Sequence, residues 1–325
     1  RLAERVAELN IICLSKGVVD LPLNVRVWSL GKEKGQSKLG YLLNFYRYIF
    51  KLRDNYDLVF VHMNPIYVVL GGIFWKIWGK KIYLWHNHRH GNVITRIAIW
   101  LSDAVFYTSP FSFSARFKKS KMMPAGIDTA VFKRDDRIQK IPHSILYAGR
   151  FSPVKNVDVL IAAADLLNKQ GVDFVINIVG QPGDDEQDNF QKIKTLARDL
   201  EARGKIRFLG GAANNQLPAI YNQNDIFVNL TQAGSFDKTI LEAMACQSIV
   251  LVSNPAYQDI FPKEWREVLM FKERDPEDLA KKLIYLMGLA ENQKIVLGQE
   301  LREIVVRGHD LDNLVEKIIH ELNQK

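Results

Sequence analysis

The sequence predicts an α/β protein with two doubly wound parallel-sheet domains that face a cleft. Three observations predict this fold. Short apolar runs alternate with longer helical patterns along the whole chain, which is typical of parallel strands joined by helices. A polar, charged segment interrupts the series near the middle. Finally, 325 residues with 47% hydrophobic content suffice for two domains with full cores.

In the first half, the apolar runs and the helical patterns between or before them are well separated. Strands are expected at residues 10–14, 25–27, 58–62, 81–85, 104–107 and 121–124. Helices are expected at residues 1–8, 40–52, 66–78 and 92–101.

The polar segment at 126–140, with its charged run 133–137, is expected to link the domains. The first domain then covers 1–135 and is joined by the C-terminal helix, and the second covers 136–325. Strands of the second domain are expected at 144–148, 174–179, 206–209, 225–230 and 248–252. Its helices are expected at 157–170, 189–203, 216–223, 275–289 and 292–322. A further helix is expected to begin within the segment 234–246.

The positive charge is concentrated in the first half of the chain. Residues 1–136 carry 21 Lys and Arg against 10 Asp and Glu, while residues 137–325 carry 23 against 26, which together give the net charge of +8. The first half is therefore the part expected to meet an anionic membrane surface or glycan, and ordinary solubilising charge is an equal alternative. No recognition-helix or aromatic–basic motif indicates nucleic acid as a partner.

Localisation is expected to be cytoplasmic, with peripheral contact on the cytoplasmic membrane face. The two cysteines, Cys13 and Cys246, have no partner at metal spacing, which indicates a reducing compartment without a structural zinc. The apolar stretch at 67–78 is interrupted by Lys76 and is far shorter than the roughly 20 residues of a membrane span.

The segment 234–246 carries the most information about function. It follows the apolar run 225–230 and begins a helix, and a strand, polar loop and helix N-terminus together form an anion site. Glu242 lies about one to two turns into that helix, at roughly 3.6 residues per turn. Because phosphate repels a carboxylate, Glu242 is better suited to hydroxyls, so the segment indicates a sugar-nucleotide pocket.

A second segment offers the cations that such a pocket needs. Gly149 and Arg150 follow the strand at 144–148, and Lys155 lies in the loop after them. Gly149 allows the loop to pass close to a ligand, and two cations neutralise a diphosphate. Taken alone, two surface cations after a turn are the simpler explanation. The presence of the 234–242 segment favours the binding site.

Several short motifs resemble those of glycosyltransferase family 4, also called group 1. They are Gly149-Arg150-x4-Lys155, Val179-Gly180, Phe208-Leu209-Gly210, Phe236-x5-Glu242-Ala243-Met244-Ala245-Cys246, Gly126-Ile127-Asp128-Thr129-x2-Phe132 and His309-x4-Leu314. Their order and spacing are typical of that family from about residue 55 onwards. The resemblance implies two Rossmann-like domains (the GT-B fold), no metal, no cofactor and retention at the anomeric carbon. It also implies a UDP- or GDP-sugar donor.

The resemblance assigns roles residue by residue. Arg150 and Lys155 would bind the diphosphate, and the main-chain N–H groups of Lys238 and Thr239 would meet its phosphate. Glu242 would hydrogen-bond the ribose, and Gly180 would allow close approach of the nucleotide. The backbone around Leu209 and Gly210 would frame the base, and Gly149, Ser235 and Phe236 belong to the same loops.

The chain departs from the family pattern at the sugar-contacting acid. The family usually has an acidic residue eight positions before the equivalent of Glu242, and Gly234 stands there. A subset of relatives resembles this chain in its Gly-Ser-x-Asp-Lys sequence. Either Asp237 or the loop amides are therefore expected to contact the sugar.

His88 is the expected acceptor-side residue at the reaction centre, with His86 as the runner-up. Both follow the strand at 81–85, where family members similarly place a histidine facing the reacting sugar. Neutral histidine can donate a hydrogen bond there. The His-x-His-x-His pattern also fits a metal, but no Cys or carboxylate cluster supports one, so no metal site is assigned. His62 is read as structural or cleft-lining.

Two other motifs have simpler explanations. Gly183-Asp184-Asp185-Glu186 resembles the acidic metal motif of the other major glycosyltransferase fold, but its Gly/Pro-flanked position favours a solvated loop. The aromatic and basic segment 45–53 could lie on a membrane. A helix packed through Phe45, Tyr48, Ile49 and Leu52 is the preferred interpretation.

The chain begins with a segment that resembles the helix after the family's first strand and glycine-rich loop, so both are expected to be missing. The function predicted is transfer of a sugar from a nucleotide-sugar donor to a hydroxyl of a glycan, either lipid-linked or of the cell envelope. The alternatives are a sugar-nucleotide epimerase of the same fold and a non-catalytic sugar-nucleotide-binding partner subunit.

Overall fold

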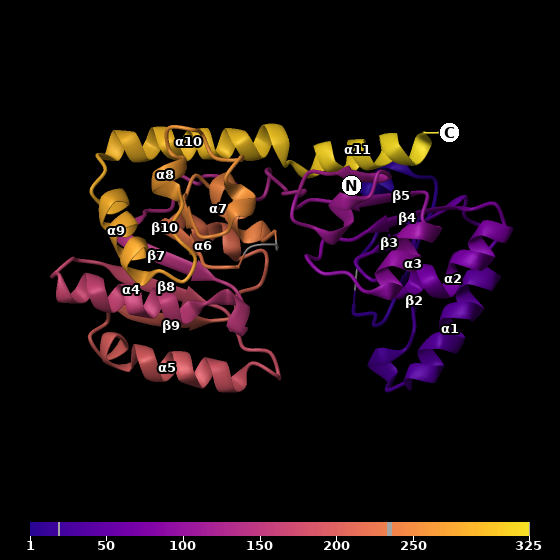
Figure 1. Ribbon diagram of the computed structural model, residues 1–325, viewed down its shortest axis with the longest axis horizontal. Coiled ribbons are helices and arrows are strands. Elements are labelled where there is room, and N and C mark those ends of the chain that lie inside the picture. Colours follow the sequence, from indigo (N-terminus) through magenta and orange to yellow (C-terminus); the bar gives the residue numbers. More distant parts are fainter. Residues whose placement is uncertain (19, 233–235, 325) are drawn as a thin grey trace. The chain divides into compact units, whose positions relative to one another are not determined.

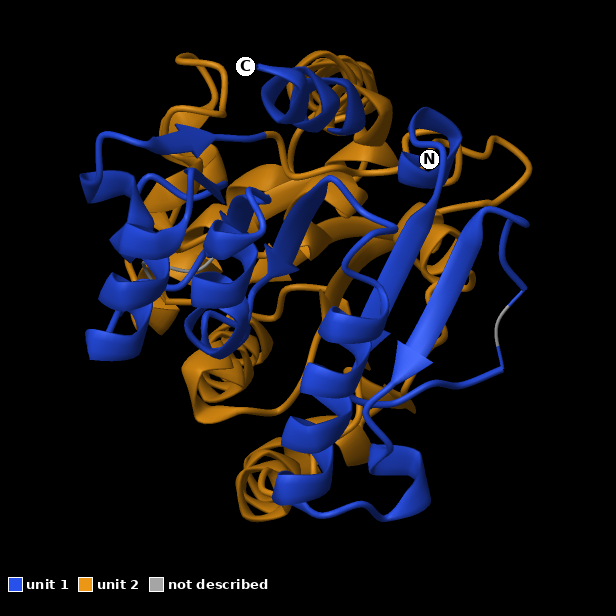
Figure 2. Cartoon of the chain, turned by 90° about the vertical axis from the view of Figure 1, so that its right-hand side faces the viewer, with its two compact units in different colours: residues 1–123, 315–325 blue, residues 124–314 orange. Residues whose placement is uncertain are grey.

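A computed structural model of the chain describes residues 1–18, 20–232 and 236–324. Its contacts divide the chain into two compact units (Figures 1 and 2). Unit 1 comprises Arg1–Met123 together with Val315–Lys325, and unit 2 comprises Pro124–Leu314. The functional assignment of an acceptor-side domain at 1–135 and a donor domain at 136–325 stays a prediction.

Unit 1 contains two separate parallel sheets. In the first, β1 (Leu9–Cys13) pairs with β2 (Val25–Ser29). The second has the order β3-β4-β5-β6. Its strands are β3 (Leu58–His62), β4 (Lys81–Trp85), β5 (Ala104–Tyr107) and β6 (Ser120–Met122).

Three long helices from the first part of the chain pack against these strands, and a fourth comes from the C-terminus (Figure 1). They are α1 (Lys38–Lys51), α2 (Ile66–Ile77), α3 (Val93–Leu101) and α11 (Leu311–Asn323), with 3-10 turns η1 (Leu2–Arg5), η2 (Lys32–Lys34) and η3 (Phe113–Arg116). Phe45, Ile49 and Leu52 are buried, which confirms that the aromatic segment packs on the core, with α1 ending at Lys51.

The helix predicted at residues 1–8 is wrong. Only the turn η1 forms, and Val6 after it is extended, with φ −131° and ψ 151°. The side-chain amide of Asn24 donates hydrogen bonds to the carbonyls of Ala3 (2.7 Å) and Val6 (3.0 Å). A distant side chain thus binds the carbonyls that a continued helix would use, and the helix ends after one turn.

Unit 2 contains one five-stranded parallel sheet in the order β11-β10-β7-β8-β9. The chain starts at the central strand, adds two strands on one side and then returns to add two on the other, which makes the sheet doubly wound. The strands are β7 (Ile141–Ala148), β8 (Val175–Val179), β9 (Ile206–Gly210), β10 (Asn224–Asn229) and β11 (Ile249–Val252).

The helices of unit 2 bury a large apolar core against this sheet. They are α4 (Val157–Lys169), α5 (Gln187–Ala202), α6 (Leu217–Gln223), α7 (Lys238–Ala245), α8 (Arg266–Leu269), α9 (Pro276–Met287) and α10 (Glu291–Gly308), with 3-10 turns η4 (Pro153–Lys155) and η5 (Pro255–Tyr257). The α-helices other than α8 correspond to helical patterns seen in the sequence.

The single helix predicted at 292–322 is wrong, because it is broken between α10 and α11. His309 leaves the helical conformation, with φ −134° and ψ 9°, and the Asp310 carboxylate accepts the Asp312 amide at 2.7 Å. Ile127 pairs with this break: its amide donates to the His309 carbonyl (2.8 Å) and its carbonyl accepts from the Leu311 amide (2.9 Å). Pairing with a segment far away in sequence therefore sets the break.

Side-chain contacts tie the last helix to the sheet of unit 1. Lys121 forms an ion pair with Glu321, the Tyr83 hydroxyl donates to the Leu322 carbonyl at 3.3 Å, and Lys317 donates to the Met122 carbonyl at 2.9 Å. No helix within the described ranges combines the length and the apolar character that a membrane span requires.

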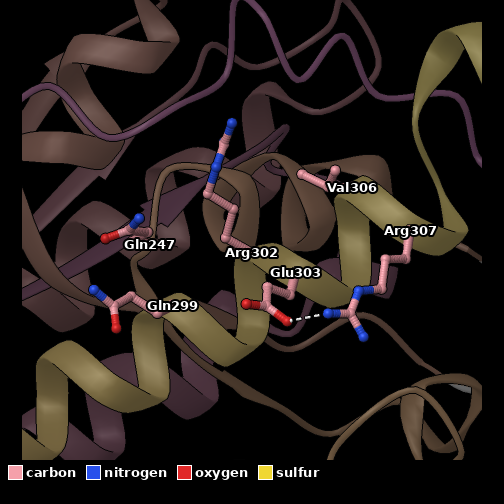
Figure 3. Close-up of a pocket in the computed structure, with 6 residues that line it drawn as sticks. All are labelled: Gln247, Gln299, Arg302, Glu303, Val306 and Arg307. Atoms are coloured by element: carbon pink, nitrogen blue, oxygen red, sulfur yellow. Dashed lines mark hydrogen bonds and ion pairs between the residues drawn. The ribbon is translucent and has the colours of Figure 1, made fainter.

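Arg302 of α10 holds together three parts of unit 2. Its guanidinium donates to the carbonyls of Thr129 (3.2 Å), Phe132 (2.9 Å) and Ala245. Arg302 also lines a surface hollow of about 420 Å³, and Figure 3 shows it pointing away from its helix neighbours. The other residues that line the hollow are Gln247, Gln299, Glu303, Val306 and Arg307. None of them is a predicted site residue, and the hollow lies at the carboxyl end of α7.

Replacing Arg302 by Met is expected to lower the free energy of unfolding by roughly 2–3 kcal/mol, because three carbonyls lose a charged donor. Arg307→Met is the matched control on the same helix. Its ion pair with Glu303 (2.7 Å) joins exposed side chains, so its loss should change stability by less than about 1 kcal/mol. Urea denaturation followed by circular dichroism measures both, and equal losses would contradict the structural role of Arg302.

Candidate functional site

Most of the predicted donor-site residues of unit 2 follow or end strands at the carboxyl edge of its sheet, which Figure 1 shows as the strands β7 to β10. Gly149 and Arg150 follow β7, Gly180 follows β8, and Leu209 and Gly210 end β9. Helix α7 begins nine residues after the end of β10. Since all five strands are parallel, these ends share one edge, which is where ligands bind in open α/β sheets.

Three glycines bring the backbones of β7, β8 and β9 close together at this edge. The Gly149 amide donates to the Val179 carbonyl (2.9 Å), and the Gly180 amide donates to the Gly210 carbonyl (2.8 Å). A Cβ on Gly180 would lie 1.9 Å from the Gly149 oxygen, a distance no side chain can adopt. The backbone of the neighbouring strand therefore requires glycine at position 180, whether or not a ligand also approaches there.

Arg150 points into solvent and has a buried carboxylate beside it. Its guanidinium lies 3.5 Å from Glu186, whose side chain is 4% exposed while that of Arg150 is 71% exposed. The second Glu186 oxygen accepts the Gly183 amide at 3.0 Å. The prediction of a solvated acidic loop at 183–186 is therefore correct for Asp184 and Asp185, which are exposed, and wrong for Glu186.

Lys155 is bound by a carboxylate in this structure. Its ammonium donates to Asp237 Oδ2 at 2.5 Å and to Thr231 Oγ1 at 3.3 Å, and both side chains of the ion pair are largely buried. Lys155 comes from η4 and Asp237 from the residue before α7, so the pair joins the loops after β7 and β10.

Asp237 also caps α7. Its Oδ1 accepts the Thr239 amide (3.3 Å) and the Thr239 hydroxyl (2.9 Å), while Oδ2 accepts from Asn229 (3.1 Å). Burial by itself raises the pKa of Asp237, but the charge and hydrogen bond of Lys155, with the bonds from Thr239 and Asn229, outweigh it and lower the pKa. Asp237 is therefore an anion at neutral pH, bound at the helix N-terminus.

This arrangement occupies part of the predicted phosphate site. One of the two main-chain N–H groups expected to meet phosphate, that of Thr239, is bonded to Asp237. The ammonium of Lys238 lies 3.4 Å from the Gly126 carbonyl, and burial lowers its pKa. Ser235 and Gly234, which belong to the same predicted loop, lie outside the described residues.

Glu242 lies in the second turn of α7, next to Tyr221 of α6. The Tyr221 hydroxyl donates to Glu242 Oε2 at 3.1 Å, and burial raises the pKa of Glu242. One carboxylate oxygen is thus held by a buried tyrosine. No side chain of the described residues donates a hydrogen bond to the other oxygen, and a carboxylate oxygen of this kind can accept from a ligand hydroxyl.

Aromatic packing holds the segment before α7. Phe236 stacks on Tyr257 with ring centres 4.7 Å apart, and the Tyr257 hydroxyl donates to the Asp237 carbonyl at 2.7 Å. The ring centre of His309 lies 6.0 Å from that of Phe236, and Nδ1 of His309 accepts the Ala125 amide at 3.3 Å. Burial lowers the pKa of His309, which agrees with a neutral ring that accepts a hydrogen bond.

Leu209 and Gly210, expected to frame the base, differ in their surroundings. Leu209 is 55% exposed, and Gly210 has φ +75°, a conformation that favours glycine. The pairing of β8 with β9 shifts register between Ile178 and Val179, so that Val179 lies opposite Gly210. The irregularity places an apolar side chain in solvent next to the glycine edge.

The two predicted histidines of unit 1 differ sharply in environment. His86 is buried and its Nδ1 lies 2.9 Å from Ser114 Oγ, whereas His88 is exposed in the loop after β4. Burial lowers the pKa of His86 to about 4, and the charge of His88 contributes to the shift. His86 is therefore neutral at physiological pH, and His88 is the one that a ligand can reach.

Sequence reasoning missed four residues of this edge: Glu186, Tyr221, Thr231 and Tyr257. Thr231 follows the buried strand β10 by two residues, a position from which it could have been proposed. The sequence marks Glu186 only as part of an acidic loop expected to be solvated. No local pattern marks Tyr221 or Tyr257, which the fold brings in from α6 and η5. Within the described ranges, no group of three His, Cys, Asp or Glu side chains is arranged to hold a metal ion.

The cations of the edge each have a carboxylate nearby. Arg150 lies beside Glu186, Lys155 is bound to Asp237, and Lys238 shares a helix face with Glu242. Three positive and three negative side chains give this part of the described structure no net charge. A diphosphate that binds here must therefore compete with at least one carboxylate.

The family model described as glycosyl transferases group 1 matches residues 128–297, more than half of the chain. The chain belongs to this family, as its motifs predicted. The matched region includes every predicted donor-site residue of unit 2.

The curated relatives include D-inositol 3-phosphate glycosyltransferases. That of Acidothermus cellulolyticus is 24% identical over 219 residues, which cover 64% of this chain and 48% of the relative. That of Salinispora arenicola is 29% identical over 113 residues, covering 34% of this chain and 25% of the relative. The matched part thus spans less than half the length of these relatives.

Solved structures confirm the GT-B fold. Anabaena HepE, solved in complex with UDP and glucose, has a TM-score of 0.75 at 18% identity and covers 93% of this chain and 86% of its own. Sucrose-phosphate synthase from Thermosynechococcus elongatus has a TM-score of 0.78 at 16% identity, covering 98% and 89%. At this identity, the similarity establishes the α/β fold with parallel sheets.

The buried neutral His86 is expected to make unit 1 less stable in acid. Its pKa is about 4 in the folded chain and about 6.5 when unfolded, so the unfolded state takes up the proton first. The stability that depends on neutral His86 is complete above pH 6.5 or so and declines as the pH falls towards about 4. Urea denaturation across this range should give a shallower decline for His86→Gln than for the exposed control His88→Gln. Parallel curves would refute the assignment.

Proposed function

We propose that the protein is a retaining, metal-independent glycosyltransferase. In this proposal it moves a sugar from a nucleoside-diphosphate sugar to a hydroxyl of a glycan or lipid-linked acceptor. Membership of the group 1 family supports the reaction class. One observation carries the proposal: two glycines, two cations and a helix N-terminus lie at one edge of the unit 2 sheet. They are Gly149, Gly180, Arg150, Lys155 and the N-terminus of α7. Uridine diphosphate is the first donor nucleotide to test, because HepE was solved with UDP.

The donor would bind mainly to residues 136–325. Arg150 and Lys155 would hold the diphosphate together with the main-chain N–H groups of Lys238 and Thr239. Glu242 would accept hydrogen bonds from the ribose hydroxyls. Leu209 and Gly210 would frame the base, with Ser235 and Phe236 in the adjoining loop.

The residues 1–135 would supply the acceptor side, with His88 at the reacting sugar and His86 as its buried neighbour. In the proposed reaction the bond between the anomeric carbon and the phosphate oxygen breaks. The acceptor oxygen bonds to that carbon on the same face, and its proton passes to the departing diphosphate. The cations of the edge stabilise the charge that develops on the leaving group.

One observation favours a second function, a non-catalytic sugar-nucleotide-binding partner subunit. Lys155 and the α7 N-terminus are already bound by Asp237, so the site accommodates an anion of its own. This function predicts that UDP binds but that no acceptor receives sugar. Incubating the protein with UDP-glucose and lipid-linked or free glycan acceptors, and measuring UDP release, distinguishes the two.

Lys155→Met is expected to weaken UDP binding about tenfold or more. The change removes a charged donor and leaves the Asp237 carboxylate without its counterion beside the phosphate. Glu242→Gln should weaken it severalfold through the ribose. Calorimetric titration with UDP measures both, and UDP, GDP and ADP sugars identify the nucleobase. Glu303→Gln on the exposed face of α10 is the control. If both site variants bind UDP as the control does, the donor site is assigned to the wrong residues.

Asp237→Asn is expected to tighten UDP binding about tenfold, which is unusual for a change within a site. Asparagine still caps α7, but the charge that competes with the diphosphate for Lys155 is gone. The gain should be present at neutral pH and shrink at a pH low enough to protonate Asp237, whose pKa is lowered.

The same variant separates the two roles considered for Asp237. If its carboxylate contacts the donor sugar, Asp237→Asn gains less affinity for UDP-glucose than for UDP. If it acts only as a counterion of Lys155, the two gains are equal. Weaker binding of plain UDP would contradict the competition between Asp237 and the diphosphate.

A further inference from the structure

Helices α2 and α3 of unit 1 expose an apolar face that nothing in the described chain covers. We call it the α2–α3 face. Trp100 is 76% exposed and Ile77 is 73% exposed, although both are large apolar side chains. The residues of the face are Ile73, Ile77, Val93, Ile94, Ile97 and Trp100.

The spacing of these residues makes the face continuous along each helix. On α3, Val93, Ile97 and Trp100 are separated by four and three residues, and on α2, Ile73 and Ile77 are one turn apart, so each set lies on one side of its helix. The opposite sides face the core of unit 1, where Val68, Trp75, Ala98, Ile99 and Leu101 are buried.

The two helices pack directly against each other, which joins the two sets (Figure 1). Gly72 of α2 is so close to α3 that a Cβ on it would lie 3.0 Å from the Leu101 side chain. Lys76 of α2 forms an ion pair of 2.7 Å with Asp103, just after α3. The α2–α3 face is therefore one patch across two helices.

The α2–α3 face is bordered by cations and lies on the basic unit. Arg96 is exposed on α3, and Lys119 donates to the carbonyls of Trp100 (3.0 Å) and Ser102 (2.6 Å). The residues 1–123 and 315–325 carry 21 Lys and Arg against 9 Asp and Glu, a net charge of +12. Unit 2 carries 23 against 27, a net charge of −4.

Tryptophan and isoleucine on one face, with lysine and arginine around them, are the composition of a helix that lies in a membrane interface. A second copy of the chain would bring two units of +12 together, which like-charge repulsion opposes. A bilayer with anionic headgroups is attracted by the same charge. We propose that the α2–α3 face docks on an anionic lipid surface, with Trp100 inserted among the headgroups.

Docking there has a consequence for the site of unit 1. The loop that carries His86 and His88 leads directly into α3, so it would lie beside the lipid surface. A lipid-linked acceptor could then reach His88 without leaving the membrane. This step rests on the proposed function, whereas the docking itself does not.

Flotation with lipid vesicles tests the proposal. The full chain should float with vesicles that contain phosphatidylglycerol, bind pure phosphatidylcholine vesicles at least about tenfold more weakly, and lose binding as salt rises. Ile97→Gln combined with Trp100→Gln should weaken binding to the anionic vesicles about tenfold. The matched control is Ile295→Gln with Val296→Gln, two exposed apolar residues on α10 of unit 2, which should bind as the parent does.

A second measurement follows the tryptophan directly. Brominated lipids should quench the fluorescence of the parent more than that of Trp100→Phe. The proposal is overturned if the chain binds no anionic vesicle, or if the α2–α3 variant floats as the control does. It is also overturned if sedimentation shows a dimer that the α2–α3 variant abolishes. UDP titration of the same variants reports on the donor site separately, so failure of docking and failure of the proposed function are distinguishable.

Discussion

The carboxylate of Asp237 makes the interactions that hold together the carboxyl edge of the unit 2 sheet. It accepts hydrogen bonds from Lys155, Asn229 and Thr239, which come from the loop after β7, the end of β10 and the first turn of α7. A parallel sheet brings the ends of its strands to one edge, but it does not by itself fix the loops beyond them. Here one buried anion supplies that fixation, and it does so where a helix N-terminus favours negative charge.

The same interaction sets the electrostatic character of the edge. Cations that are paired with carboxylates cost less to hold in a partly buried site than isolated cations do. A phosphate that bound at this edge would have to replace the Asp237 carboxylate at Lys155, so the protein would give up contacts of similar strength. Such an arrangement would favour a ligand whose shape lets it replace several of the Asp237 bonds at once over a ligand that matches only the charge.

Much of the fold could be predicted from local patterns, and the exceptions have a common cause. The strands β3 and β4 coincide with the apolar runs at 58–62 and 81–85, because buried parallel strands are apolar on both faces. Gly149, Gly180, Lys155 and Glu242 could be singled out as candidates because their motifs are local, and their roles stay predictions. Other features could not be predicted locally, because each depends on a residue at least 18 positions away. The end of η1 depends on Asn24, which bonds Val6 across 18 positions, and the break before α11 depends on the pairing of Ile127 with His309. Arg150 finds its partner in Glu186, and Lys155 finds its partner in Asp237, 82 positions away.

The division of unit 1 between the two ends of the chain has a consequence for how the protein is made. Unit 2 is continuous from Pro124 to Leu314, whereas unit 1 needs residues from Val315 onwards. During synthesis on the ribosome, Tyr83, Lys121 and Met122 emerge long before their partners in α11. Unit 2 can therefore complete its core while unit 1 still lacks its last helix, so the unit that begins the chain is the last to be finished. A nascent chain in that state would present the uncovered strands of unit 1 to chaperones.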